Sequence, residues 1–128
     1  MQHQHLARDT ASVGVARHRL RAALADAGVG DPVAYDATLV LSELVSNAVE
    51  HGHPDATGGI SVGWSIEPDR IVIDVRDAGP TRRFEPGHPS ADATRGRGLM
   101  IVDDICSAWH VETDHGTRVV AELALTAA

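Results

Sequence analysis

One stretch of the sequence places an acid and an amide one helical turn apart. At about 100° per residue of an α-helix, Glu43, Asn47 and Glu50 fall within roughly 60° of one another on one face. Mg²⁺ takes few protein oxygens, so one amide oxygen together with nucleotide phosphates is enough to hold it. A carboxylate that stays off the metal can act as a general base. The stripe therefore suits a hard cation and a reacting hydroxyl, although the same spacing also occurs on ordinary solvated helix faces.

The helix that carries this stripe is predicted to open at Asp31 and Pro32, because proline is tolerated in a first helical turn, and to stop at Gly52. Its opposite face is apolar, with Ala37, Leu41, Leu44, Val45 and Ala48. The helix should therefore pack this apolar face against the core and leave the acid–amide stripe on the other side.

A first helix is predicted upstream of this one. It should run to about Ala27, with Thr10 or Ser12 as its N-terminal cap. Residues 1–9 are polar, and we expect them to be disordered. Residues 10–128 are then predicted to form a single domain.

The hydrophobic period changes to two after the second helix. Residues 60–66 and 71–75 alternate apolar with small or polar side chains around a turn at 67–70, which predicts a β-hairpin. Asp77 keeps the parity of the apolar residues before it, so it should point toward the apolar face, where an unsatisfied carboxylate is costly. Residues 78–95 have no clear period and are predicted to form a lid or a disordered loop.

The last quarter of the chain predicts a short helix and a second hairpin. The helix is expected at 99–106, and the two strands at 109–113 and 117–125. The full order predicts an α+β fold, a two-layer sandwich in which a mixed or antiparallel sheet carries helices on one face.

Composition narrows the classes of function. The 128 residues carry a formal net charge of -7, which disfavours direct binding to nucleic acid. The single cysteine, Cys106, cannot form an internal disulfide, which fits a reduced, cytoplasmic setting. No run approaches the length of a membrane span, and no signal peptide is evident, so we expect no membrane association.

Four features in this order resemble a known family. They are the Glu43/Asn47 helix, Asp77-Ala78-Gly79, Gly96-Arg97-Gly98 and Gly116-Thr117. Together they resemble the N, G1, G2 and G3 boxes of the Bergerat-fold ATPases, which include histidine kinases, gyrase, Hsp90 and MutL. Within that superfamily the chain is similar to the stand-alone anti-sigma factor serine kinases of bacteria, and the similarity implies the histidine-kinase-like ATPase fold.

The resemblance implies roles for the residues already singled out. Asn47 would hold Mg²⁺, and Glu43 would be the general base for the attacking hydroxyl. Asp77 would accept a hydrogen bond from the adenine amino group of ATP, and Gly79 would let the base lie close. Thr117 would sit beside the adenine, bonded to Asp77 directly or through water.

The remaining nucleotide-binding residues that the resemblance implies are His51, Arg95, Gly96, Arg97, Gly98 and Leu99. The two glycines would bring backbone N–H groups and a helix N-terminus to the phosphates. Arg95 and Arg97 both suit the γ-phosphate, and their spacing does not decide between them. One departure from the family pattern is Arg118, which stands where a second hydroxyl residue often follows Thr117.

The leading interpretation is an ATP-dependent serine/threonine-protein kinase that phosphorylates an anti-anti-sigma (STAS-type) protein and sequesters a sigma factor, with a homodimer as a compatible state. One alternative is a non-catalytic module that binds ATP or a partner and acts by sequestration. Another is a detached histidine-kinase ATP-binding domain, which is weakened by the absence of a helical pair with a phosphoacceptor histidine. His51 and His53 could also be a metal pair, but no third ligand has suitable spacing.

Overall fold

The structure, a computed structural model, describes residues 1–51, 58–79, 100–113 and 116–125. Its elements in chain order are β1 (Gln2–Ala7), α1 (Ala11–Asp26), α2 (Asp31–His51), β2 (Gly59–Ile66), β3 (Arg70–Asp77), β4 (Ala108–Glu112) and β5 (Thr117–Ala124). Residues 100–105 are also helical. The predicted lid at 78–95 lies outside the described residues from position 80 onward.

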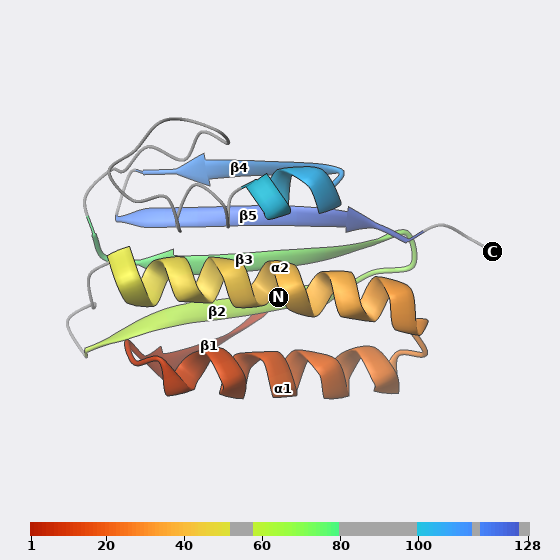
Figure 1. The fold of residues 1–128 in the computed structure, drawn as a ribbon, viewed down its shortest axis with the longest axis horizontal. Helices are drawn as coiled ribbons and strands as arrows, with labels where there is room; N and C mark the ends of the chain where they lie inside the picture. Colours follow the sequence, from red (N-terminus) through yellow and green to blue (C-terminus); the bar gives the residue numbers. More distant parts are fainter. Residues whose placement is uncertain (52–57, 80–99, 114–115, 126–128) are drawn as a thin grey trace.

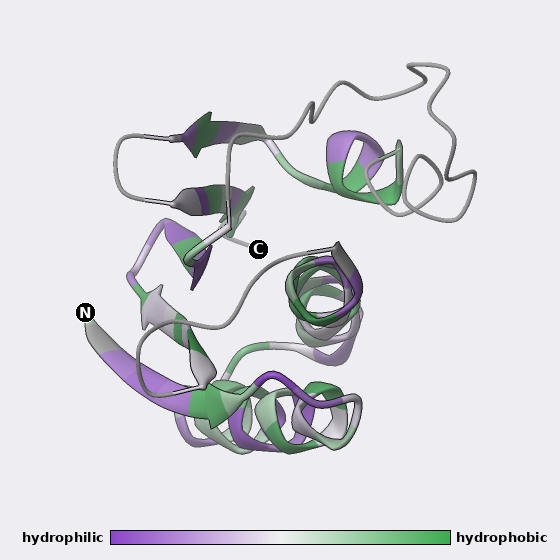
Figure 2. Ribbon diagram, turned by 90° about the vertical axis from the view of Figure 1, so that its left-hand side faces the viewer, coloured by the Kyte–Doolittle hydropathy of each residue, from purple (hydrophilic) through white to green (hydrophobic). Residues whose placement is uncertain are grey.

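The strands form one five-stranded sheet in the order β1-β2-β3-β5-β4, and every pairing is antiparallel. Helices α1 and α2 and residues 100–105 all lie on the same face of this sheet (Figures 1 and 2). The predicted α+β sandwich is therefore confirmed, with an antiparallel rather than a mixed sheet. Within the described ranges, no helix is both long enough and apolar enough to cross a bilayer.

The core lies between the two layers and is aliphatic. In β2 the larger residues face the helices, while Gly59, Ser61, Gly63 and Ser65 alternate with them along the helix-free face. The largest fully buried apolar side chains are Leu20, Leu24, Leu41, Leu44, Ile60, Ile71, Ile73, Val40, Val45, Val62 and Val102. Burying each of them contributes about 1.5–3 kcal/mol, so the apolar side of α2 is what fixes that helix on the sheet.

The expectation of a disordered N-terminus is wrong for Gln2–Ala7, which form the edge strand β1. The strand pairs with β2 from Gln2↔Trp64 to Ala7↔Gly59, and Leu6 is only 9% exposed in the core. Its polar sequence reflects an edge position, where one face meets solvent. Thr10 occupies the N-cap position of α1, as predicted, but its side chain makes no capping hydrogen bond. The Asp9 carboxylate accepts the Ala11 N–H instead, at 2.9 Å.

Three elements bring the predicted site residues toward one end of the domain. The C-terminal end of α2, the end of β3 and the start of β5 lie at the same end of the long axis, on the left in Figure 1. In the β3–β5 pairing, Asp77 is the direct partner of Thr117. The fold therefore gathers residues that are far apart in the sequence into one region.

Candidate functional site

Asp77 and Thr117 form a buried polar pair at the end of the β3–β5 ladder. Their side chains are 7% and 1% exposed, among apolar neighbours such as Val75. The Oδ1 atom of Asp77 accepts the Gly79 N–H at 2.7 Å, and the Thr117 hydroxyl donates to the Gly79 carbonyl at 3.4 Å. The inward direction predicted for Asp77 is thus confirmed, and its carboxylate holds the chain that leaves β3.

Gly116 makes this close pairing possible. Its φ is +88°, in the left-handed region that favours glycine. A side chain at this position would collide with the backbone carbonyl oxygen of Asp77 and the backbone of Ala78. Glycine is therefore required before Thr117, because two backbones approach closely there. The sequence alone did not reveal this reason.

Helix α2 presents Glu43 and Asn47 on its polar stripe. Glu43 is half-buried and makes no hydrogen bond or ion pair with any residue that the structure describes. Burial raises the pKa of the Glu43 carboxyl, and the nearby charge of Glu50 raises it further. A carboxylate without a partner and with a raised pKa is suited to accept a proton.

Asn47 is 8% exposed, and its amide has no side-chain hydrogen bond within the described part of the chain. No group of three His, Cys, Asp or Glu side chains that could hold a metal occurs in that part either. A single amide oxygen cannot hold Mg²⁺ without further ligands. Among the residues that the structure describes, the donor set fits a cation that takes its other ligands from a nucleotide and water.

A cavity of about 470 Å³ lies between α1 and α2 and has Glu43 in its wall. The α1 side contributes Arg17 and Arg21, and the α2 side contributes hydroxyl groups, including those of Tyr35 and Ser46. Neither Asn47 nor Asp77 lines this cavity. We call it the α1–α2 groove. Glu43 thus borders a polar, partly cationic opening on the side of α2 that faces α1.

The predicted phosphate-binding residues Arg95, Gly96, Arg97, Gly98 and Leu99 lie outside the described residues, and so does the side chain of His51. Their roles stay predictions. The described part of the site therefore consists of two pieces, the Asp77–Thr117 pair and the stripe on α2.

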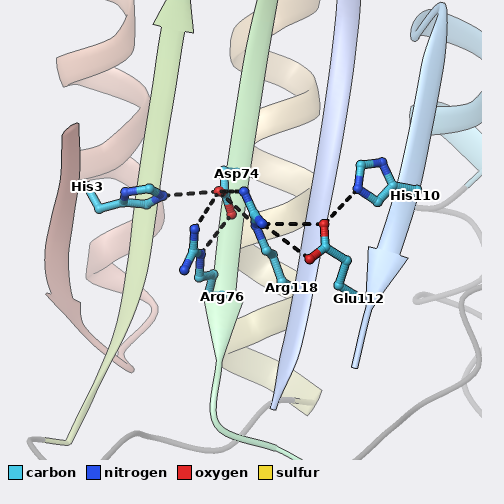
Figure 3. Close-up of polar contacts among 6 residues, drawn as sticks. All are labelled: His3, Asp74, Arg76, His110, Glu112 and Arg118. Atoms are coloured by element: carbon cyan, nitrogen blue, oxygen red, sulfur yellow. Dashed lines mark hydrogen bonds and ion pairs between the residues drawn. The ribbon is translucent and has the colours of Figure 1, made fainter. Parts of the chain in front are cut away.

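Asp74 was not anticipated from the sequence and bonds basic side chains from three strands of the sheet. It lies on the helix-free face of β3 and is 0% exposed. Arg118 of β5 donates to its Oδ2 from Nη2 at 2.7 Å and from Nε at 3.0 Å, and Arg76 binds it at 3.2 and 3.3 Å. The His3 ring of β1 lies 3.1 Å from the same Oδ2, and Arg118 continues to Glu112 of β4 (Figure 3).

This network crosses β1, β3, β5 and β4, and we refer to Asp74 with His3, Arg76 and Arg118 as the Asp74 cluster. Burial on its own would raise the pKa of Asp74, but hydrogen bonds from Arg118, Arg76 and His3 hold it at about 2. Asp74 is therefore ionised, and its charge is shared among three strands.

We expect Asp74 to make the stability of the fold depend on pH in acid. A pKa lowered from 3.8 to about 2 on folding gives stability that is complete above about pH 4 and is lost as the pH falls through about 2. The size of this contribution is about 2 kcal/mol. Urea unfolding across that range should show a steeper loss of unfolding free energy in the wild type than in Asp74→Asn. Equal slopes would contradict the assignment.

Comparison with known proteins bears on the family and on the fold. Residues 6–123 match the family described as "Histidine kinase-like ATPase domain". Over 120 residues, the chain is 27% identical to "Serine-protein kinase RsbW" of Oceanobacillus iheyensis, with 84% of this chain and 76% of that protein covered. It is 28% identical to the protein of the same name from Bacillus licheniformis, with 84% and 74% covered.

Two solved structures share the fold. One contains the RsbU and RsbW domains of Rv1364c from Mycobacterium tuberculosis, with a TM-score of 0.68 and 23% identity; the match covers 97% of this chain and 32% of that chain. The other is the histidine kinase domain of the blue-light activated histidine kinase EL346 from Erythrobacter litoralis, with a TM-score of 0.54 and 22% identity over 72% of this chain and 44% of that one. At these identities the likeness concerns the fold, and this chain spans about a third of the length of the first structure.

Proposed function

We propose, from the premise that this chain belongs to the family of histidine kinase-like ATPase domains, that it is an ATP-dependent serine/threonine-protein kinase of the anti-sigma factor type. Its acceptor would be an anti-anti-sigma protein of the STAS type, and its second partner would be a sigma factor that it sequesters. Similarity to two proteins named serine-protein kinases supports this proposal. Family membership implies the use of ATP.

The observation that carries the proposal is the state of Glu43. A protein that only held ATP would have no use for a half-buried carboxylate without a partner, whose pKa is raised by burial and by Glu50. Such a group costs stability in its charged form, so its presence is better explained by a task in proton transfer.

In the proposed reaction the acceptor hydroxyl oxygen forms a bond to the γ-phosphorus of ATP, and the bond from that phosphorus to ADP breaks. Glu43 takes the hydroxyl proton. Asn47 would hold Mg²⁺ together with the nucleotide phosphates, and the chemistry supplied there would be neutralisation of charge on the transferring group. At the other end of the nucleotide, Asp77 and Thr117 would recognise the adenine, with Asp77 accepting a hydrogen bond from its amino group.

The acceptor is proposed to approach Glu43 through the α1–α2 groove. Arg17 and Arg21 give this groove positive charge, although the whole chain carries a net charge of -7. A segment with acidic residues beside its serine would therefore be favoured there over a basic one.

Labelled phosphate transfer tests the proposed function directly. The full chain, γ-labelled ATP and Mg²⁺ are incubated with candidate STAS-type proteins, each paired with a control in which the acceptor serine is replaced by alanine. The proposal expects label on the wild-type acceptor and none on the control. Stable capture of the partner without any transfer, across acceptors that bind, would contradict the kinase assignment and favour a sequestering module.

Asn47→Ala is expected to separate the metal from the nucleotide. If Asn47 holds Mg²⁺, its loss should weaken binding of Mg-ATP much more than binding of ATP in EDTA, because only the first complex uses the amide oxygen. Isothermal titration with and without Mg²⁺ measures both affinities. Ser46→Ala, one position away on the groove side of α2, is the matched control and should bind like the wild type. An equal loss in EDTA and in Mg²⁺ would remove the metal role from Asn47.

A further inference from the structure

Two arginines face each other in the β3–β5 ladder, directly beside the proposed adenine-reading pair. The register pairs Arg76 with Arg118 and, one step further, Asp77 with Thr117. Like charges directly opposite in an antiparallel ladder push the strands apart. A negative charge is therefore needed beside the two arginines, where the site requires β3 and β5 to stay close together.

Asp74 supplies this charge. Its carboxylate lies between the two guanidinium groups and bonds both, with Arg118 the closer at 2.7 Å (Figure 3). The two arginines differ in their other contacts. Arg118 also reaches Glu112 at 3.3 Å, whereas Arg76 has Asp74 as its only side-chain partner among the described residues. Without Asp74, Arg76 would be left unpaired opposite a second cation.

The other end of the same two strands offers a comparison. There Arg70 of β3 pairs with Glu122 of β5 at 2.8 Å, with side chains 48% and 31% exposed. This pair also joins β3 to β5 but lies far along the ladder from Asp77. It therefore provides a control for the general effect of losing a cross-strand ion pair.

We propose that Asp74 is a positioning residue for adenine recognition, because it holds Arg76 and Arg118 together and thereby fixes the spacing of Asp77 and Thr117. This inference rests on the proposed function, in which that pair reads the base of ATP. Asp74 touches neither nucleotide nor acceptor in this scheme. It acts through the backbone of β3 and β5, from the opposite face of the sheet.

The test uses Asp74→Asn in the full chain, which keeps the shape of the side chain and removes its charge. ATP affinity should fall by about 2- to 5-fold, and the preference for ATP over GTP should fall with it. The second variant is Asp74→Asn combined with Arg76→Gln, which removes the unpaired cation. It should regain most of the lost affinity and the lost preference for adenine.

Glu122→Gln is the matched control and should change neither affinity nor base preference. If the wild type binds no adenine nucleotide, the proposed function itself fails. If the wild type binds ATP and Asp74→Asn binds it equally well, only the positioning role is overturned. Should Asp74→Asn fail to fold, the double variant is compared with Arg76→Gln alone. Equal ATP affinity supports the proposal, and weaker binding by the double variant overturns it.

Discussion

Glu43→Ala is expected to abolish nearly all phosphoryl transfer while leaving ATP bound. General-base catalysis acts in the transition state and not in ground-state binding, so the rate should fall about 10²- to 10⁴-fold with ATP affinity changed by no more than a few-fold. Partner binding should persist, because the substitution leaves the packed face of α2 and the groove arginines Arg17 and Arg21 in place. Single-turnover transfer of labelled phosphate, with nucleotide affinity measured on the same samples, separates the two effects.

The pH dependence of the phosphoryl-transfer rate provides a second test of this prediction. The base must be ionised, so the rate should fall as the pH drops through the raised pKa of Glu43. Glu50→Gln removes one cause of that shift and should move the acid limb of the profile to lower pH.

Glu43→Gln should fold at least as stably as the wild type near neutral pH, because a raised pKa means that the charged form opposes folding. A Glu43→Ala protein that transfers phosphate as fast as the wild type would exclude the catalytic role.

Asp77→Asn is expected to remove adenine specificity. The carboxylate would accept the amino group of the base in a pocket where Asp77 is 7% exposed, and an unpaired polar group there costs about 1–3 kcal/mol. ATP affinity should therefore fall by about 5- to 150-fold. GTP, which carries an oxygen in place of the amino group, should gain relative to ATP. Competition binding with both nucleotides measures the ratio.

Asp69→Asn is a suitable control for this substitution, because Asp69 is an exposed acid in the turn at the other end of β3. It should keep the affinity and preference of the wild type. Circular dichroism on both variants checks that the sheet is intact. If GTP already competes as well as ATP in the wild type, Asp77 does not read adenine.

The parts of the fold that follow from local pattern were predictable from the sequence. The apolar face of α2 fixed its orientation, and the parity of Ile71, Ile73 and Val75 placed Asp77 inward, where it is found. Both signals depend only on neighbouring residues in one element. They were sufficient for the two-layer arrangement, for the stripe on α2 and for the inward direction of Asp77.

Other features depend on partners that are distant in the sequence. Strand β1 has a polar sequence with little hydrophobic pattern, and it is ordered by its pairing with β2 and by His3 bonding to Asp74. The same parity argument assigns Asp74 to the solvent face, yet it is 0% exposed because side chains from three strands cover it. The adjacency of β3 to β5, which brings Arg118 there, could not be read from one sequence.

The strand order also separates early steps of folding from late ones. Of the four strand pairings, β2–β3 and β4–β5 close over short turns, whereas β1–β2 closes over both helices and β3–β5 closes over all residues between Asp77 and Thr117. Long-range pairings form later, because the chain loses the entropy of closing a long loop before the contacts of the pairing are made. The seam between β3 and β5 therefore joins two hairpins that can form independently. A ligand that contacts both sides of this seam stabilises interactions made late, so it should slow unfolding of the domain more than it accelerates folding.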